Sequence, residues 1–179
     1  MMRSRDSSAA AGGGGGPVRR GLWFEDYSVG HEVVTAARTI TESDVVAFAG
    51  LSGDFNPLHV DAPFAERTAF RGRIAHGLLV ESIASGLVAQ TGVFDGTIAA
   101  LAEVRSTFVR PTPIGTTIHV RLEVLELQQD PPAGRGRVRL RKRVYDSESE
   151  LVAEGEWLVV VRRDRSRRKT PDAASEASA

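Results

Sequence analysis

The stretch from Ser52 to His59 holds the side chains whose types and spacing could do chemistry. Its sequence is Ser-Gly-Asp-Phe-Asn-Pro-Leu-His, which places the carboxylate of Asp54 and the imidazole of His59 five residues apart. Pro57 lacks a backbone N–H and disfavours helical geometry at the residue before it, so a tight, irregular turn is predicted and no regular helix. A carboxylate that only accepts hydrogen bonds and an imidazole that can gain or lose a proton could together hold and activate one water molecule.

An isolated Asp-x-x-x-x-His pair is more often a turn followed by a surface histidine, because Asp, Asn, Gly and Pro are ordinary turn residues. The surrounding residues make the pattern more specific. In identity and spacing, ten positions resemble the signature of the MaoC-like, (R)-specific enoyl-CoA hydratase family, also called hydratase 2. They are Phe48, Leu51, Ser52, Gly53, Asp54, Asn56, Pro57, Leu58, His59 and Ala65.

This resemblance implies a reversible reaction in which water adds in the syn sense to a trans-2-enoyl-CoA, giving (3R)-3-hydroxyacyl-CoA. It also implies that Asp54 and His59 both bind the attacking water. Which of the two takes the water proton stays open, because two coupled groups titrate as a pair. The Asn56 amide is a candidate substrate-site residue that orients the loop or the histidine ring, or it only forms an Asx turn.

A second candidate site is the pair His76-Gly77, which begins the strongest predicted helix. A helix N-terminus carries partial positive charge, and a glycine lets a thioester carbonyl approach its N–H closely. The family also has a His-Gly pair at this place, which implies that Gly77 is the oxyanion donor. The alternatives are a glycine needed only for packing and, for His76, a structural, hydrogen-bonded role.

The composition is that of an ordinary globular domain, with 41% apolar and 26% charged residues in a chain of 179. Lys+Arg and Asp+Glu both number 23, so no strong overall field favours nucleic acid. No apolar run reaches the ~18 residues that a membrane span needs, and no secretory signal is visible, so a cytoplasmic location is expected. Cysteine is absent, and no metal-ligand or dinucleotide motif is found, so neither a metal nor a cofactor is expected.

Composition also divides the chain into three parts. Residues 1–21 are polar and rich in glycine, which predicts a disordered leader. Residues 22–161 form the predicted domain. Residues 162–179 begin with a basic cluster and are predicted to be a solvated, disordered tail, an electrostatic contact with an acidic partner being the weaker alternative.

Within the domain, the pattern predicts one enclosed helix and a series of strands. Capping-box spacing at Thr41 predicts a helix over residues 42–51, and Asp61 is a candidate cap for a short helical turn. The central helix is predicted over residues 75–90. Strands are predicted over residues 31–40, 97–109, 117–124, 137–144 and 151–161, with an open hairpin loop at 129–136.

These elements predict an α+β fold with an antiparallel sheet wrapped around one helix, which is the hotdog fold that the resemblance implies. Residues 41–73 would then form the overhanging segment that carries the active site. The family pairs two hotdogs through their sheets, so a homodimer or a dimer of dimers is expected. A single hotdog also favours short or medium acyl chains.

Three other functions remain open. A hotdog thioesterase places its acid or base on the central helix, where Glu81 is the only carboxylate. A dehydratase could act on carrier-bound, branched or dicarboxylic acyl thioesters, and a non-catalytic subunit could only bind acyl-CoA. For the phosphates of coenzyme A, one candidate basic set lies in the overhang, at Arg67, Arg71 and Arg73. The stripe Arg137, Arg139, Arg141 and Arg143 is interpreted as the solvated face of a sheet.

Overall fold

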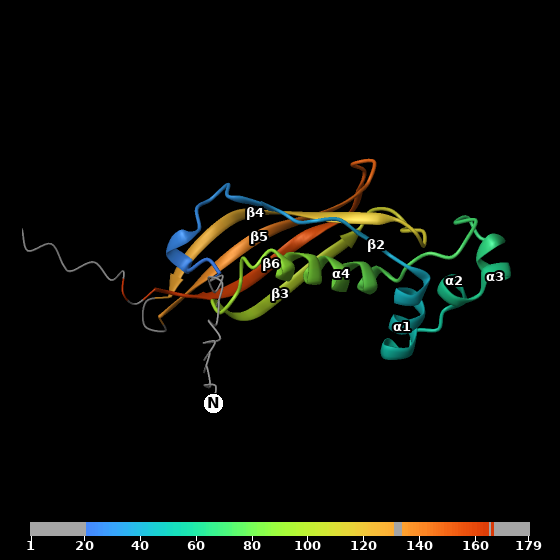
Figure 1. The fold of residues 1–179 in the computed structure, drawn as a ribbon, viewed down its shortest axis with the longest axis horizontal. Helices are drawn as coiled ribbons and strands as arrows, with labels where there is room; N and C mark the ends of the chain where they lie inside the picture. Colours follow the sequence, from blue (N-terminus) through green and yellow to red (C-terminus); the bar gives the residue numbers. More distant parts are fainter. Residues whose placement is uncertain (1–20, 131–133, 165, 167–179) are drawn as a thin grey trace, which may run out of the picture.

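The computed structural model describes residues 21–130, 134–164 and 166 (Figure 1). Residues 1–20 of the predicted leader and most of the predicted tail lie outside the described residues. The two boundary residues belong to the fold: Gly21 is buried and donates its N–H to the Asp95 carbonyl (2.7 Å), and Arg162 is the last residue of a strand. None of the helices in the described part of the chain is long and apolar enough to span a lipid bilayer.

A six-stranded antiparallel sheet forms the body of the molecule (Figure 1). Its strand order is β1-β4-β5-β6-β3, and β2 pairs separately with β4. The strands are β1 (Glu32–Val34), β2 (Arg38–Thr39), β3 (Ile98–Phe108), β4 (Thr117–Asp130), β5 (Arg135–Asp146) and β6 (Leu151–Arg162). The helices are the 3-10 helix η1 (Phe24–Asp26) and the α-helices α1 (Glu42–Ser52), α2 (Pro57–Val60), α3 (Ala62–Glu66) and α4 (Gly77–Gln90).

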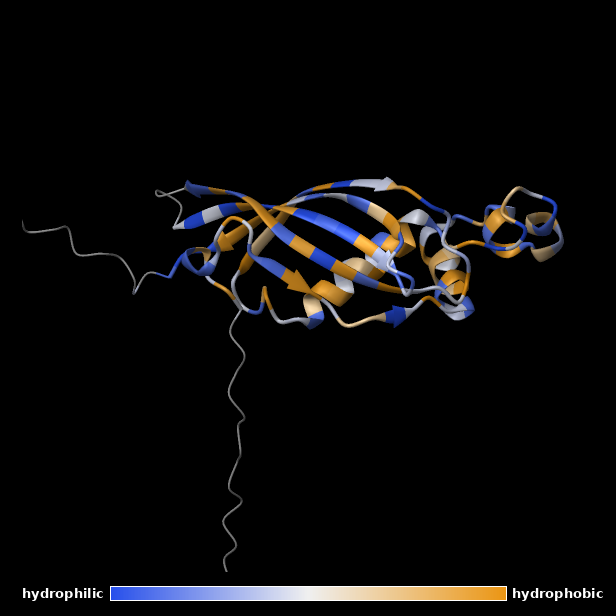
Figure 2. Ribbon diagram, turned by 90° about the horizontal axis from the view of Figure 1, so that it is seen from above, coloured by the Kyte–Doolittle hydropathy of each residue, from blue (hydrophilic) through white to orange (hydrophobic). Residues whose placement is uncertain are grey.

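Helix α4 lies along one face of the curved sheet, whereas α2 and α3 project beyond its end (Figure 1). Hydrophobic and hydrophilic residues alternate along the strands, as the period-two pattern predicted (Figure 2). The inward residues of β4 pack with α4 in one core, which confirms the enclosed central helix and the hotdog fold. The buried residues of α4 are Leu79, Val80, Ile83, Ala84, Leu87 and Val88.

Two strand predictions need correction. The single strand predicted over residues 31–40 is divided into β1 and β2. Between them, the Thr35 hydroxyl donates to the Ala36 carbonyl (2.7 Å) and accepts from the Val120 N–H (3.0 Å), so a side chain replaces part of the backbone ladder. The hairpin loop is shorter than predicted, because β4 continues to Asp130 and β5 begins at Arg135. The central part of that loop lies outside the described residues.

A buried polar cluster joins α4 to three strands. Lys142 points inward from β5 and is fully buried, so it replaces an apolar residue in the alternating pattern. Its ammonium pairs with the Glu81 carboxylate and donates to the Ser106 hydroxyl at 2.9 Å. The same carboxylate accepts from Ser106 Oγ at 2.5 Å and from Trp157 Nε1 at 2.9 Å. Burial lowers the pKa of Lys142, and the neighbouring Glu81 carboxylate opposes that shift.

Removing the cation alone leaves the largely buried Glu81 carboxylate without a countercharge, although its hydrogen bonds from Ser106 and Trp157 remain. We therefore expect Lys142→Met to lower the free energy of unfolding by about 3–5 kcal/mol. Adding Glu81→Gln removes the orphan charge and keeps an amide oxygen for Trp157 Nε1, so the double variant recovers most of the loss. Urea unfolding of the wild type, the two single variants and the double variant measures the coupling.

The matched control is Arg141→Met, one residue earlier on β5, where the cation pairs with Glu123 on the exposed face (2.8 Å). A surface pair of this kind contributes at most about 1 kcal/mol. Equal losses for Lys142→Met and Arg141→Met would contradict the burial argument.

Candidate active site

Helix α1 leads directly into the motif loop. Its two ends are fixed by local structure, so the position where the loop begins is fixed as well. Thr41 and Asp44 form the predicted capping box, with Asp44 N–H donating to Thr41 Oγ1 (3.2 Å) and Thr41 N–H to Asp44 Oδ2 (2.8 Å). The backbone hydrogen bond from Thr41 holds the pKa of Asp44 below its usual value, and the Arg38 guanidinium adds to the shift. Gly53 ends the helix in the left-handed region (φ 77°), which directs the following residues away from the helix axis.

The residues after Gly53 fold differently from the prediction. Residues 54–56 form the expected irregular loop, but Pro57 begins the four-residue helix α2, which contains His59. Proline is tolerated at the first helical position because the N–H that it lacks would have no partner there. The side-chain oxygen Oδ1 of Asn56 accepts the Leu58 N–H at 3.0 Å, so the Asn56 side chain caps α2 in the manner of an Asx turn.

The segment just before α4 determines which nitrogen of His59 is available. The Ile74 carbonyl lies 2.8 Å from His59 Nδ1, and because a carbonyl only accepts, Nδ1 carries the proton. In the tautomer that this bond selects, Nε2 is the free acceptor of the half-buried ring. The Ile74 N–H also donates to the Leu58 carbonyl (3.3 Å), which holds α2 against this segment.

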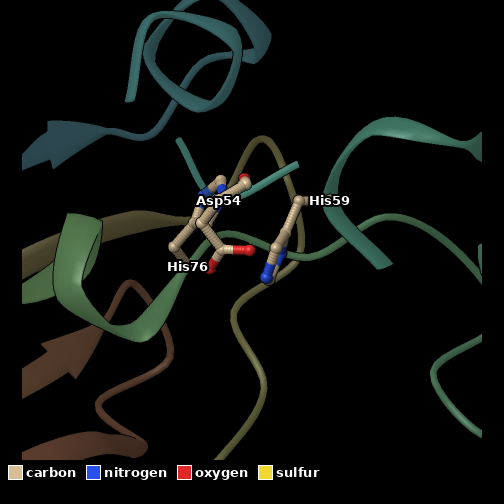
Figure 3. Close-up of side chains that lie close together, drawn as sticks. All are labelled: Asp54, His59 and His76. Carbon is tan, nitrogen blue, oxygen red and sulfur yellow. The ribbon is translucent and has the colours of Figure 1, made fainter. Parts of the chain in front are cut away.

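The Asp54 carboxylate faces the same space as the His59 ring (Figure 3). Asp54 is solvent-exposed, and its Oδ1 accepts the Asn56 N–H at 3.2 Å. One ligand atom each of Asp54, His59 and His76 lies within 4.8 Å of the others. The fold thus brings the predicted pair close enough for one water molecule to contact both side chains.

His76 is the residue whose contacts the sequence did not reveal. It is only 3% exposed, and its Nε2–H donates to the Asp54 backbone carbonyl at 2.9 Å. Its ring stacks on the His59 ring, with centroids 3.7 Å apart and planes 29° from parallel. The only indication in the sequence was the position of His76 next to Gly77.

The same three residues form the group in the described part of the chain that comes nearest to a metal site. Two of their four ring nitrogens already donate to carbonyls. One nitrogen of each ring is therefore left without a carbonyl partner.

Gly77 is the first residue of α4, where backbone N–H groups have no partner within the helix. A Cβ at this position would lie 2.8 Å from Phe108 Cε2. Phe108 is 46% exposed and its ring can shift, so packing against Phe108 is only a weak reason for a glycine at position 77.

The candidate phosphate contacts are only partly free. Arg73 pairs with Glu42 at 2.8 Å, whereas Arg67 and Arg71 are exposed in the overhang. The stripe on β5 is an ion-paired outer face of the sheet, in keeping with its interpretation as a solvated face. Its pairs are Arg139 with Glu103, Glu126 and Glu156, and both Arg141 and Arg143 with Glu123.

Comparison with known proteins gives consistent matches. A family model described as "MaoC like domain" matches residues 26–143. The chain is 38% identical over 145 residues to a 3-hydroxybutyryl-CoA dehydratase of Methylorubrum extorquens, covering 81% of this chain and 87% of the relative. It is 37% identical over 117 residues to an (R)-specific enoyl-CoA hydratase of Aeromonas caviae, covering 65% and 83%. The solved structure of R-hydratase PhaJ1 from Pseudomonas aeruginosa superposes with a TM-score of 0.69 at 33% identity, covering 80% of this chain and 88% of that one.

The cap of α2 gives a first test of the loop. Asn56→Ala removes the acceptor for the Leu58 N–H and should cost about 1 kcal/mol of stability, whereas Asn56→Asp keeps an acceptor and should cost less. Denaturant unfolding of both variants measures the difference. If both variants unfold like the wild type, the cap does not contribute to the stability of this loop.

Proposed function

Because the chain belongs to the MaoC-like domain family, we propose that it catalyses reversible syn hydration of trans-2-enoyl-CoA to (3R)-3-hydroxyacyl-CoA. The observation that carries this proposal is the shared orientation of the Asp54 carboxylate and the His59 ring beside the N-terminus of α4 (Figure 3). The hydratase and dehydratase relatives support the same class of reaction, a hydro-lyase.

In the proposed mechanism, one water molecule lies between the Asp54 carboxylate and the free Nε2 of His59. A base of this pair takes a proton from the water while its oxygen forms a bond to C3. The electron pair of the double bond moves to the thioester oxygen, where the Gly77 N–H stabilises the developing negative charge. The proton then passes to C2 on the same face as the thioester carbonyl re-forms, so one water molecule supplies both the hydroxyl on C3 and the hydrogen added to C2.

No cofactor takes part in this scheme. The thioester itself activates the double bond, so coenzyme A belongs to the substrate. The proton acceptors, Asp54 and His59, are side chains of the chain, and a third side chain, Asn56, shapes the loop between them. A substrate-binding role for Asn56 extends that contact and is part of the same proposal.

The hydrogen bonds of Glu81 argue against the thioesterase alternative. Both oxygens of this carboxylate already accept hydrogen bonds from neighbouring side chains. Both oxygens are therefore already engaged in the buried cluster with Ser106, Lys142 and Trp157. Glu81 also lies one turn beyond Gly77 on α4. If the protein were a thioesterase using Glu81, the motif loop with Asp54 and His59 would have no role.

The free edge of β3 supports the proposed homodimer. β3 ends the strand order, so one of its edges has no partner strand in the described chain. Unpaired strand edges and contiguous exposed apolar residues mark association sites. The large apolar residues of β3 that are 37–46% exposed are Ile98, Leu101, Val104 and Phe108. Pairing of β3 with its own copy is self-complementary, as a two-fold dimer requires.

Purified protein should hydrate crotonyl-CoA, seen as loss of the enoyl-thioester absorbance, and chiral analysis should identify the (3R) alcohol. Asp54→Asn and His59→Ala should each lower kcat by at least about a hundredfold, because each removes a proton-transfer group. His119→Ala, in β4 outside the proposed site, is the matched control and should retain full activity.

Full activity in both site variants would refute the assignment of the pair. A folded, dimeric wild type without turnover would reject short linear enoyl-CoA. Carrier-bound or branched substrates would then be tested, followed by acyl-CoA binding without turnover. Release of free thiol would identify a thioesterase.

The dimer has its own test. Val104→Lys places a charge on the exposed apolar strip of β3 and should convert the dimer to a monomer in sedimentation velocity experiments. Val46→Lys on α1 is the control, because Val46 is similarly exposed (53% against 45%) but lies away from β3. A dimer that persists in the Val104 variant would exclude this edge as the interface.

A further inference from the structure

We infer that His76 is a positioning residue for the proposed hydration, on which this inference rests. It holds the proton-transfer pair at a set place relative to the Gly77 N–H. Three observations carry the inference: the hydrogen bonds made by residues 74–76, the buried Nδ1 of His76 that has no partner among the described residues, and the stack of its ring on His59.

The residues just before α4 form hydrogen bonds with both ends of the loop over residues 54–59, which holds Asp54 and His59. At the C-terminal end of the loop, the Ile74 carbonyl accepts a hydrogen bond from His59 Nδ1–H (2.8 Å), and the Ile74 N–H donates to the Leu58 carbonyl (3.3 Å). At the N-terminal end of the loop, His76 Nε2–H donates to the backbone carbonyl of Asp54 (2.9 Å). Because Gly77 follows directly, one short segment connects both proton-transfer residues to the proposed oxyanion donor.

The hydrogen bonds of His76 determine its form. Nε2 carries a proton, because its partner is a carbonyl. Nδ1 is buried and has no hydrogen-bond partner among the described residues. A proton there would be an unsatisfied buried donor, which is costly. The ring is therefore neutral with its proton on Nε2, so it does not compete for the proton that moves between water and C2.

The stack gives this neutral ring a second effect. The His76 face covers the His59 ring at 3.7 Å, which restricts rotation of His59 about its side-chain bonds. When His59 holds a proton, an uncharged aromatic face beside it is favourable, whereas a second cation would repel it. Phe48 packs against His76 at 5.1 Å and helps to hold the ring in place.

Three substitutions separate the two contacts of His76. His76→Phe keeps an aromatic face without the donor, His76→Gln keeps a donor without the ring, and His76→Ala removes both. For crotonyl-CoA hydration, we expect His76→Ala to lower kcat about a hundredfold with little change in KM, as for misplaced reacting groups. The Phe and Gln variants should each retain part of the activity. His119→Phe is the control, because His119 stacks on Tyr145 away from the site (5.7 Å) and should keep the wild-type kcat.

A second measurement does not depend on turnover. The ¹⁵N shifts of the imidazole rings, recorded at about pH 8, where histidines are ordinarily neutral, should show His59 in the wild type with its proton on Nδ1 alone. In His76→Ala, the His59 signal should shift towards a mixture of tautomers. The Phe and Gln variants provide the same comparison if the alanine variant does not fold, and melting curves identify which variants are folded.

The outcomes separate this inference from the proposed function. Loss of kcat together with a mixed His59 tautomer supports the positioning role. Variants with kcat within about twofold of the wild type and an unchanged His59 tautomer would overturn it and leave the hydratase proposal intact. A wild type without turnover, combined with a tautomer change in the variants, would overturn the proposed reaction while the effect of His76 on His59 stands.

Discussion

The burial of helix α4 against the sheet is the constraint on which the rest of the structure depends. Its apolar face packs against the inner side of the strands, and the Glu81 carboxylate bonds to side chains from β3, β5 and β6. These contacts fix the place where the helix begins. That place is the end of the sheet beyond which α2 and α3 project, so the N-terminus of a rigid helix meets an exposed loop there (Figure 1).

Some residues of the motif determine the shape of the loop, and others have the proposed chemical role. Gly53 permits the left-handed end of α1, Asn56 caps α2, and Pro57 occupies the first position of α2. None of these roles requires a substrate, because Gly, Asn and Pro are ordinary turn residues. The two side chains left over, Asp54 and His59, face one space, and their proposed role depends on the shape that the others impose (Figure 3).

Sequence reasoning succeeded where the cause of a feature is local. The capping box at Thr41, the cap at Asp61 and the alternation along β4 and β5 depend on residues close in the chain, and the structure contains all three. It also gave the hotdog fold and the family. The helix around His59 was missed because proline was treated as a helix breaker, although a first helical position accepts it.

Features that join distant segments could not be predicted. The alternation along β5 puts Lys142 on the inner face of the sheet, but nothing in the sequence names Glu81 as its partner on another element. The stack of His76 on His59 similarly depends on how the overhang folds back on the segment before α4. Thr35 divided a predicted strand because its hydroxyl meets a backbone N–H of β4.

The hydrogen bonds that orient the loop have a consequence for how this protein can change over evolution. Their acceptors at Ile74, Leu58 and Asp54 are main-chain carbonyls, which every amino acid supplies. The side chains of Ile74 and Leu58 are therefore not needed for these bonds. Residues around the site can be replaced to fit acyl groups of other shapes while the loop keeps its main-chain anchors. A new substrate preference and an intact geometry of the proposed proton-transfer pair are thus separable traits in this architecture.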